Sequence, residues 1–196
     1  MKALDLFCGL GGWSDGLAAE DFDVTGVELV PMIAALYRHK VILADCRYLP
    51  LRSGVPWDLI VGSPPCREFT AAYSGNWKVP RDFDRGLILV NAFLDAVTFM
   101  APRYWFMENV PGLTKHIDLK PRVKARLGKG MYRCFWGTFP AFLVPLDYNK
   151  KIFHLKGVPS KLRSWYRARI PLAVARSLGR AVKTAISLSA WRHGAA

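Results

Sequence analysis

The residue with the clearest chemical potential in this sequence is Cys66, which follows two consecutive prolines in Gly62-Ser63-Pro64-Pro65-Cys66-Arg67. The apolar run 59–61 predicts a buried strand that stops at the glycine. The prolines stiffen the exit from that strand, because each fixes φ at about −65°. Open α/β sheets place ligands beyond the carboxyl ends of their strands, and the adjacent Arg67 would favour the thiolate form of Cys66. The segment therefore predicts a nucleophile at a ligand-binding edge, although an isolated cysteine is more often a buried structural residue.

A glycine-rich turn after the first predicted strand offers a second ligand-binding feature. It reads Phe7-Cys8-Gly9-Leu10-Gly11-Gly12, with Ser14 where the third glycine of a GxGxxG motif would fall. Glu28 ends the next strand near the offset of about 20 residues that is typical of a ribose-binding acid. Asp45 ends the strand after that and suits an adenine amino group. Each acid alone would fit helix capping equally well, but the three features together favour a cofactor that contains a nucleoside.

The elements that must position these residues alternate between strands and helices. Apolar and β-branched runs predict strands at residues 3–7, 24–28, 41–43, 57–61, 104–108, 132–135 and 141–146. Helical periodicity predicts helices at residues 14–19, 32–37, 86–100 and 171–188, the first of them capped by Ser14 and Asp15. Residues 67–85 and 147–169 are expected to be irregular. This alternation predicts a doubly wound, Rossmann-like α/β sheet with a parallel core.

The composition indicates one domain and is compatible with binding to nucleic acids. The 196 residues carry a net charge of +13, with 28 Lys and Arg, seven Trp and seven Tyr. Basic and aromatic side chains suit phosphates and stacked bases, although a solvated basic face with core aromatics explains them equally well.

Cysteine spacing and hydropathy exclude several classes of protein. The four cysteines form no CxxC pair, which argues against a zinc site and a disulfide framework and for a reducing cytoplasm. No apolar run reaches the roughly 18 residues that a membrane span needs. The N-terminal residues lead directly into a predicted strand and leave no room for a signal peptide. We therefore expect a soluble cytoplasmic protein without a bound metal.

Five sequence blocks, in this order along the chain, resemble those of the C5-cytosine-specific DNA methyltransferase family. They are Asp5-Leu6-Phe7-Cys8-Gly9, Gly26-Val27-Glu28, Ala44-Asp45-Cys46, Pro64-Pro65-Cys66 and Glu108-Asn109-Val110. The likeness runs from residue 3 to about residue 185. It implies an α/β fold of the S-adenosylmethionine-dependent methyltransferase type.

The resemblance assigns catalytic roles at the carboxyl ends of the predicted strands. The Pro-Pro-Cys cysteine of the family, here Cys66, adds as the thiolate to carbon 6 of cytosine. Glu108 assists at N3 as an acid or hydrogen-bond donor, and an ordinary strand-end carboxylate is the alternative. Arg133 fits one arginine of a Gln-x-Arg-x-Arg block and is expected near the cytosine carbonyl oxygen or the thiol, or else on a phosphate. Asn109 is expected to brace two loops.

The same resemblance implies the contacts with S-adenosylmethionine. Phe7 would stack on the adenine, Glu28 would hold the ribose hydroxyls, and Asp45 would accept from the adenine amino group. Leu29 would cover the other face of the adenine or belong to the core. The remaining expected cofactor-binding residues are Gly9, Leu10, Gly11, Cys46 and Pro65. In a late block, Ala168 stands where the family has an Asn that contacts the methionine part.

The region that reads DNA in this family is short here. A basic segment, residues 137–166, stands in place of a target-recognition domain, and a helix over residues 167–190 returns to the catalytic domain. We therefore expect a short or relaxed recognition sequence, or specificity supplied by a partner protein or a second subunit. The nucleic-acid contacts are expected from Arg67, Arg81, Arg85, Lys150 and Lys151.

The substrate is expected to be DNA, duplex or single-stranded, with its cytosine extruded from the stack. Residues 67–85 would form the lid over that base. Two alternatives remain. RNA is one, because the family includes a tRNA-directed branch. A non-catalytic nucleic-acid-binding protein that retains the fold is the other.

Overall fold

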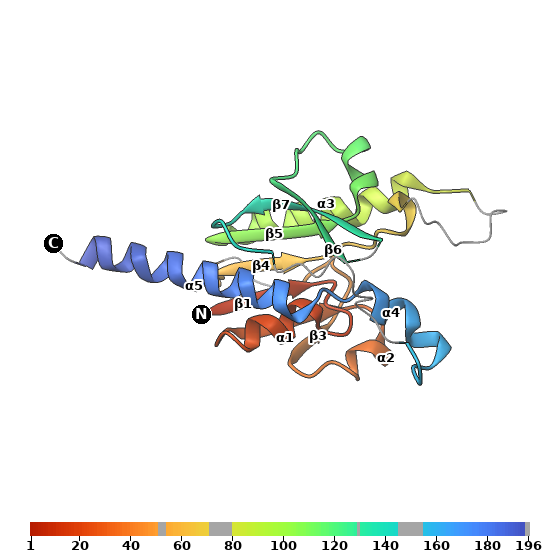
Figure 1. The fold of residues 1–196 in the computed structure, drawn as a ribbon, viewed down its shortest axis with the longest axis horizontal. Coiled ribbons are helices and arrows are strands. Elements are labelled where there is room, and N and C mark those ends of the chain that lie inside the picture. Colours follow the sequence, from red (N-terminus) through yellow and green to blue (C-terminus); the bar gives the residue numbers. More distant parts are fainter. Residues whose placement is uncertain (51–53, 71–79, 129, 145–154, 195–196) are drawn as a thin grey trace.

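A seven-stranded sheet forms the centre of the molecule, with helices on both faces (Figure 1). The computed structural model describes residues 1–50, 54–70, 80–128, 130–144 and 155–194, with residues 190–194 described by their backbone alone. The strands are β1 (Lys2–Leu6), β2 (Asp23–Glu28), β3 (Lys40–Leu43), β4 (Leu59–Gly62), β5 (Tyr104–Asn109), β6 (Val123–Gly128) and β7 (Met131–Thr138). They lie in the order β3-β2-β1-β4-β5-β7-β6. The first five pair in parallel, and β7 runs antiparallel to both β5 and β6. The predicted doubly wound α/β sheet with a parallel core is confirmed.

Helices cover the two faces of this sheet. They are α1 (Gly12–Ala18), α2 (Pro31–Ala34), α3 (Phe83–Met100), α4 (Arg163–Ala168) and α5 (Leu172–Gly194), with 3₁₀ turns η1 (Arg67–Phe69), η2 (Pro111–Lys115) and η3 (Ser160–Leu162). Figure 1 shows α3 on one face and α1 with α5 on the other, and α5 continues past the sheet towards the C-terminus. None of the helices in the described part of the chain combines the length and apolar character that a membrane span requires.

Two hydrophobic cores lie on opposite faces of the sheet, because successive residues of a strand point to opposite sides. Leu4 and Ile60 pack in the same cluster as Phe93 of α3. Leu59 packs on the other face, in the cluster that contains Leu178 of α5. All of these side chains are fully buried. The parallel strands are therefore covered on both sides, and their carboxyl ends form the open edge.

The start of the first helix differs from the prediction. Helix α1 begins at Gly12, and its N-cap is Gly11, which has a φ of 77°. Ser14 is fully buried, and its hydroxyl donates a 2.5 Å hydrogen bond to Asp5 Oδ2. The prediction that Ser14 and Asp15 cap this helix is therefore wrong, because the glycine turn itself supplies the left-handed residue at the entry.

The later strands also differ from the prediction. Strand β6 was not predicted, because basic residues interrupt its short apolar pattern. Residues 141–144 form no strand, and residues 145–146 lie outside the described part. Helix α4 lies within the stretch that was expected to be irregular. Pairing with β7, rather than local sequence, decides the position of β6.

Candidate functional site

A cavity of about 890 Å³ lies at the carboxyl ends of the parallel strands. This volume falls within the range of about 300–1,000 Å³ that is usual for small-molecule sites. Most of the predicted cofactor-binding residues line it: Phe7, Gly9, Leu10, Glu28, Leu29, Asp45, Cys46 and Pro65. Cys66, Arg67 and Arg133 line it as well. Gly11 and Glu108 are not among the described lining residues; Gly11 caps α1, and Glu108 is only 5% exposed.

The proline turn that carries Cys66 is tied to the neighbouring strand by Asn109. The Asn109 amide nitrogen donates a 2.9 Å hydrogen bond to the Pro64 carbonyl oxygen. Its amide oxygen accepts from the Val110 backbone nitrogen at 2.8 Å. The Asn109 side chain is buried, so these bonds are sheltered from water. Asn109 therefore braces the two loops, as predicted, and holds the half-buried Cys66 at the mouth of β4.

Glu108 and Arg133 form a buried ion pair beside this turn. Strands β5 and β7 run antiparallel, and Glu108 lies opposite Phe135, two residues from Arg133. The Arg133 Nε lies 2.5 Å from Glu108 Oε1, and little of either side chain is exposed. Ser63, between β4 and the prolines, accepts a hydrogen bond from Trp13 Nε1 at 3.0 Å, and its hydroxyl lowers the pKa of Glu108. Three adjacent strands thus converge on this carboxyl group.

Burial decides the protonation of these groups. It raises the pKa of Glu108, and the opposing effects of Arg133 and Ser63 only reduce that shift. Burial and the Glu108 carboxylate also raise the pKa of Cys66, so the resting site holds the thiol at neutral pH. The described cation that lowers the Cys66 pKa is Arg133 rather than the predicted Arg67. The Arg67 guanidinium lies 3.8 Å from Glu68.

Glu28 joins the glycine turn to the end of β2. One carboxylate oxygen accepts from the Gly9 backbone nitrogen at 3.0 Å, and the other accepts from the Val30 nitrogen at 2.9 Å. Val30 is the N-cap residue of α2, so Glu28 contacts the start of this short helix and holds the glycine turn at the same time. The carboxylate is buried yet lines the cavity, where it presents acceptors to a ligand.

Asp45 and Leu29 lie at the same end of the cavity. Asp45 pairs with Arg47 at 2.6 Å, and this hydrogen-bonded cation lowers the Asp45 pKa. The carboxylate is therefore held ionised as an acceptor. No helix begins after it within the described residues 44–50, so helix capping is excluded for Asp45. Leu29 is 59% exposed, which excludes the core alternative and leaves its side chain free to cover a ligand.

Helix α4 and the residues after it form a wall of the cavity that was not expected from the sequence. Ser164, Trp165, Arg167, Ala168, Arg169 and Ile170 all line the cavity. Arg169 pairs with Asp15 of α1 at 2.5 Å, which brings this late segment onto the glycine turn. The adjacent aromatic residues Trp165 and Tyr166 within a basic stretch were the available signal, but the stretch was assigned as irregular.

The predicted nucleic-acid contacts are only partly brought together. Arg67 lines the cavity. Arg81 donates a 2.9 Å hydrogen bond to the Thr70 carbonyl oxygen, and Arg85 is exposed in the first turn of α3. Neither is among the described lining residues. Lys150 and Lys151, together with residues 71–79 of the expected lid, lie outside the described part of the chain.

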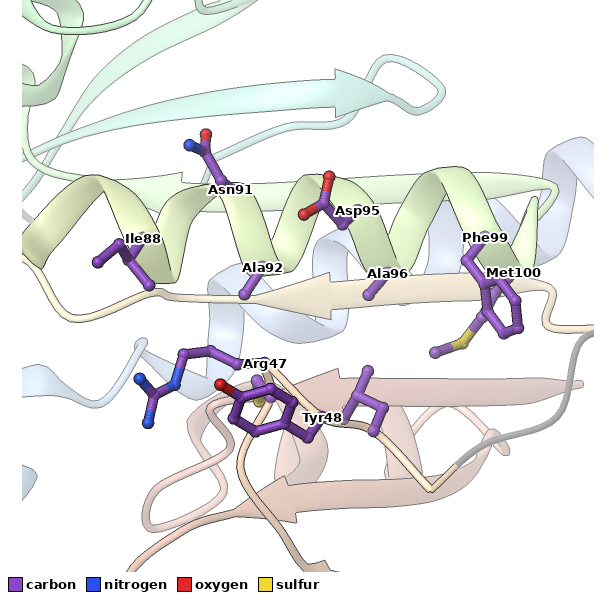
Figure 2. Close-up of a pocket in the computed structure, with 11 residues that line it drawn as sticks. Arg47, Tyr48, Ile88, Asn91, Ala92, Asp95, Ala96, Phe99 and Met100 are labelled. Carbon is purple, nitrogen blue, oxygen red and sulfur yellow. The ribbon is translucent and has the colours of Figure 1, made fainter. Parts of the chain in front are cut away.

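A second, smaller cavity of about 480 Å³ lies between α3 and the segment after β3. Figure 2 shows Ile88, Ala92 and Ala96 of α3 facing Arg47 and Tyr48 across it. Cys46 lines both cavities, and burial raises its pKa to about 12. Neither Cys66 nor Glu108 is among its described lining residues. The candidate chemistry therefore belongs to the larger cavity.

The described residues do not gather the side chains of a metal site. Within the described ranges, no three His, Cys, Asp or Glu side chains lie close enough together to hold an ion. All four cysteines are described, and each is a free thiol.

The sequence of this chain is similar to those of known DNA methyltransferases. The family model described as C-5 cytosine-specific DNA methylase matches residues 1–144. Type II methyltransferase M.AplI of Arthrospira platensis is 35% identical over 138 residues, covering 68% of this chain and 38% of its own length. Mouse DNA (cytosine-5)-methyltransferase 1 is 24% identical over 170 residues. That match covers 72% of this chain and 10% of the mouse protein.

One solved structure shows the same fold. A crystal structure of an E. coli prophage-encoded protein, named as a DNA modification methyltransferase, superposes with a TM-score of 0.51 at 23% identity. The match covers 70% of this chain and 46% of that one. The chain thus spans less than half the length of each of these three relatives.

Proposed function

Because the chain belongs to the C-5 cytosine-specific DNA methylase family, we propose that it methylates carbon 5 of cytosine in DNA. The cofactor of this family is S-adenosyl-L-methionine. The observation that supports the activity is one shared cavity: Cys66 and Arg133 line the part beside Glu108, and Glu28 and Asp45 line the rest.

The cavity residues fit the cofactor chemically. Glu28 and Asp45 present carboxylate acceptors that suit ribose hydroxyls and an amino group. Phe7 and Leu29 offer apolar surface for the adenine, and Gly9 leaves the backbone of the turn accessible. When bound, S-adenosyl-L-methionine supplies an electrophilic methyl group.

The residues at the Cys66 end would act on the cytosine. Cys66 must first lose its proton to water, and then its sulfur forms a bond to carbon 6 while the carbon 5–carbon 6 π bond breaks and electrons move through the ring towards N3. Glu108, whose pKa is raised by burial, gives a proton or a hydrogen bond to N3 as charge develops there. The Arg133 guanidinium pairs with Glu108 and lowers the pKa of Cys66. After carbon 5 is methylated and loses its proton, the sulfur–carbon bond breaks and Cys66 is released.

Methyl transfer from labelled cofactor to duplex DNA, single-stranded DNA and tRNA tests this proposal. We expect label in cytosine of DNA, with the modified context read by bisulfite sequencing. Absence of transfer to either form of DNA would overturn the proposal. Label in tRNA alone would mean that the substrate is RNA and that the same reaction takes place on its cytosine.

We also propose a domain organisation and a partner for the protein. We propose that residues 1–196 act as one catalytic domain, in which residues 137–166 replace a recognition domain and residues 167–190 return to the sheet. A partner protein or second subunit would then supply sequence specificity, because base reading needs more contact surface than the short segment offers. The expected location is the cytoplasm. Copurification of a second chain, or a dimer by light scattering, checks this expectation.

A further inference from the structure

Trp165 of α4 lies directly over the glycine turn. A Cβ atom built on Gly9 would lie 3.5 Å from Trp165 Cε3 and 3.7 Å from Cζ3. These are van der Waals distances, so an edge of the six-membered ring of the indole lies beside the turn at Gly9. Trp165 is half-buried and lines the large cavity together with Gly9 and Glu28. The indole therefore forms part of the wall opposite the end of β1.

Contacts between the segment after α4 and helix α1 set the position of this indole. Arg169 pairs with Asp15 Oδ2 at 2.5 Å, and His39 holds the other oxygen of that carboxylate at 2.9 Å. A Cβ atom on Gly12 would lie only 2.6 Å from the Ile170 nitrogen, so the two backbones touch. Ile170 itself is 4% exposed. Trp165 is thus carried by a segment that packs into the body of the protein.

The charges of the cavity explain why an aromatic wall would matter. Four arginines line it, Arg67, Arg133, Arg167 and Arg169, against the carboxylates Glu28 and Asp45. Glu108 and Asp15 offset the charges of Arg133 and Arg169, so a cationic ligand group in this cavity meets charges of both signs, and an uncharged aromatic contact would add to its attraction. The face of a tryptophan attracts a cation without carrying a charge of its own. Ala168, in the same segment, has no polar side-chain group that could provide such a contact.

We infer that Trp165 is a cofactor-recognition residue whose indole contacts the sulfonium-bearing part of S-adenosyl-L-methionine. It favours the positively charged methyl donor over the neutral thioether product, S-adenosyl-L-homocysteine. This inference rests on the proposed function, since it takes that cofactor to be the ligand of the cavity. It concerns binding alone and does not depend on which nucleic acid is methylated.

Calorimetric titration of the purified protein with each of the two ligands tests the inference. For Trp165→Ala we expect the Kd for S-adenosyl-L-methionine to rise about tenfold, because one cation–π contact is lost. The Kd for S-adenosyl-L-homocysteine should rise less than about threefold. Trp165→Phe should lie between the wild type and the alanine variant, since a benzene ring keeps part of the attraction.

Tyr166→Ala provides the matched control. Tyr166 is the next residue of α4 and a half-buried aromatic, but it is not among the described residues that line the cavity. Its replacement should leave both Kd values unchanged. Thermal unfolding of all variants verifies that each one is folded at the temperature of the titration.

Two results would overturn the inference while the proposed function stands. One is an unchanged Kd for S-adenosyl-L-methionine in Trp165→Ala, and the other is an equal loss of affinity for both ligands. If the unaltered protein binds neither ligand, the proposed function fails and the inference fails with it.

Discussion

The two ends of the large cavity are assembled in different ways. At the nucleophile end, Cys66, Glu108 and Arg133 come from the ends of adjacent strands, and sheet pairing brings them together. At the cofactor end, helix α4 and the residues after it cover the glycine turn. The contact between Arg169 and Asp15, which are 154 positions apart in the chain, attaches this segment to α1. The first end depends on strand register and the second on the docking of a late segment.

The carboxyl groups at the two ends differ as well. Glu108 is 5% exposed, and burial raises its pKa even though Arg133 contacts it. Asp45 lies closer to solvent, and its contact with Arg47 lowers its pKa. The comparison shows how environment shifts the pKa of one type of side chain in opposite directions, which suits the two proposed roles, a proton donor beside Cys66 and an ionised acceptor for the cofactor. The following variants test whether the two ends work separately.

Cys66→Ser should have the largest effect. A serine hydroxyl is a far weaker nucleophile than a thiolate, so we expect methyl transfer to fall by roughly 10³-fold or more. The Kd for S-adenosyl-L-methionine should stay the same, because the change lies at the nucleophile end. Cys134→Ser, in a buried cysteine of β7 outside the described cavity lining, is the control and should retain activity. A Cys66→Ser enzyme as active as the wild type would contradict the nucleophile assignment.

Glu108→Gln sharpens the role of the buried acid. The amide can donate a hydrogen bond but cannot transfer a proton, so we expect methyl transfer to fall about 10²-fold or more. Single-turnover rates with saturating cofactor measure this loss. A loss below about tenfold would show that hydrogen bonding to N3 is sufficient. Cofactor affinity should again be unaffected.

Asp5→Asn tests a buried carboxyl beneath the cofactor end. Asp5 is 1% exposed, its Oδ1 has no hydrogen-bond partner among the described residues, and burial raises its pKa to about 7. A folded pKa above the unfolded one stabilises the fold only while the group is protonated, so this contribution is lost as pH rises from about 4 to 7. We expect wild-type unfolding free energy to be about 2–3 kcal/mol higher at pH 5 than at pH 8 from this group.

The asparagine variant should lose that part of the pH dependence, because an amide does not titrate. Chemical denaturation at both pH values measures the difference. If the unfolding free energy changes equally between the two pH values in the wild type and the variant, Asp5 does not titrate in this range.

Gly12→Ala should have the smallest effect on stability and should act at the cofactor end. The added methyl would lie 2.6 Å from the Ile170 nitrogen, so the segment after α4 must shift, at a cost of about 1–2 kcal/mol. We expect the Kd for the cofactor to rise, and the rate of Cys66 alkylation to stay unchanged. In Gly179→Ala, the methyl would meet only side-chain atoms at 3.3 Å or more, which makes it a milder control. A changed alkylation rate in Gly12→Ala would mean that the two ends are coupled.

The order and spacing of short blocks were enough to predict the sheet and the residues at the nucleophile end. Each block combines an apolar run, which must be buried, with a turn whose residues have few conformations, as in Pro64 and Pro65. Such local constraints place Cys66 at a strand end whatever the rest of the chain does. The family resemblance, rather than these local constraints, predicted that Asn109 braces two loops.

Tertiary structure decided the features that depend on residues far apart in the chain. Pairing of β7 with β5 brings Arg133 to Glu108, so Arg133 rather than the adjacent Arg67 lowers the Cys66 pKa. Docking of α4 places Trp165 over Gly9, in a stretch whose local pattern indicated no element. Protonation states and cavity walls depend on burial and on neighbours across the fold, and these arise only when the chain has closed on itself.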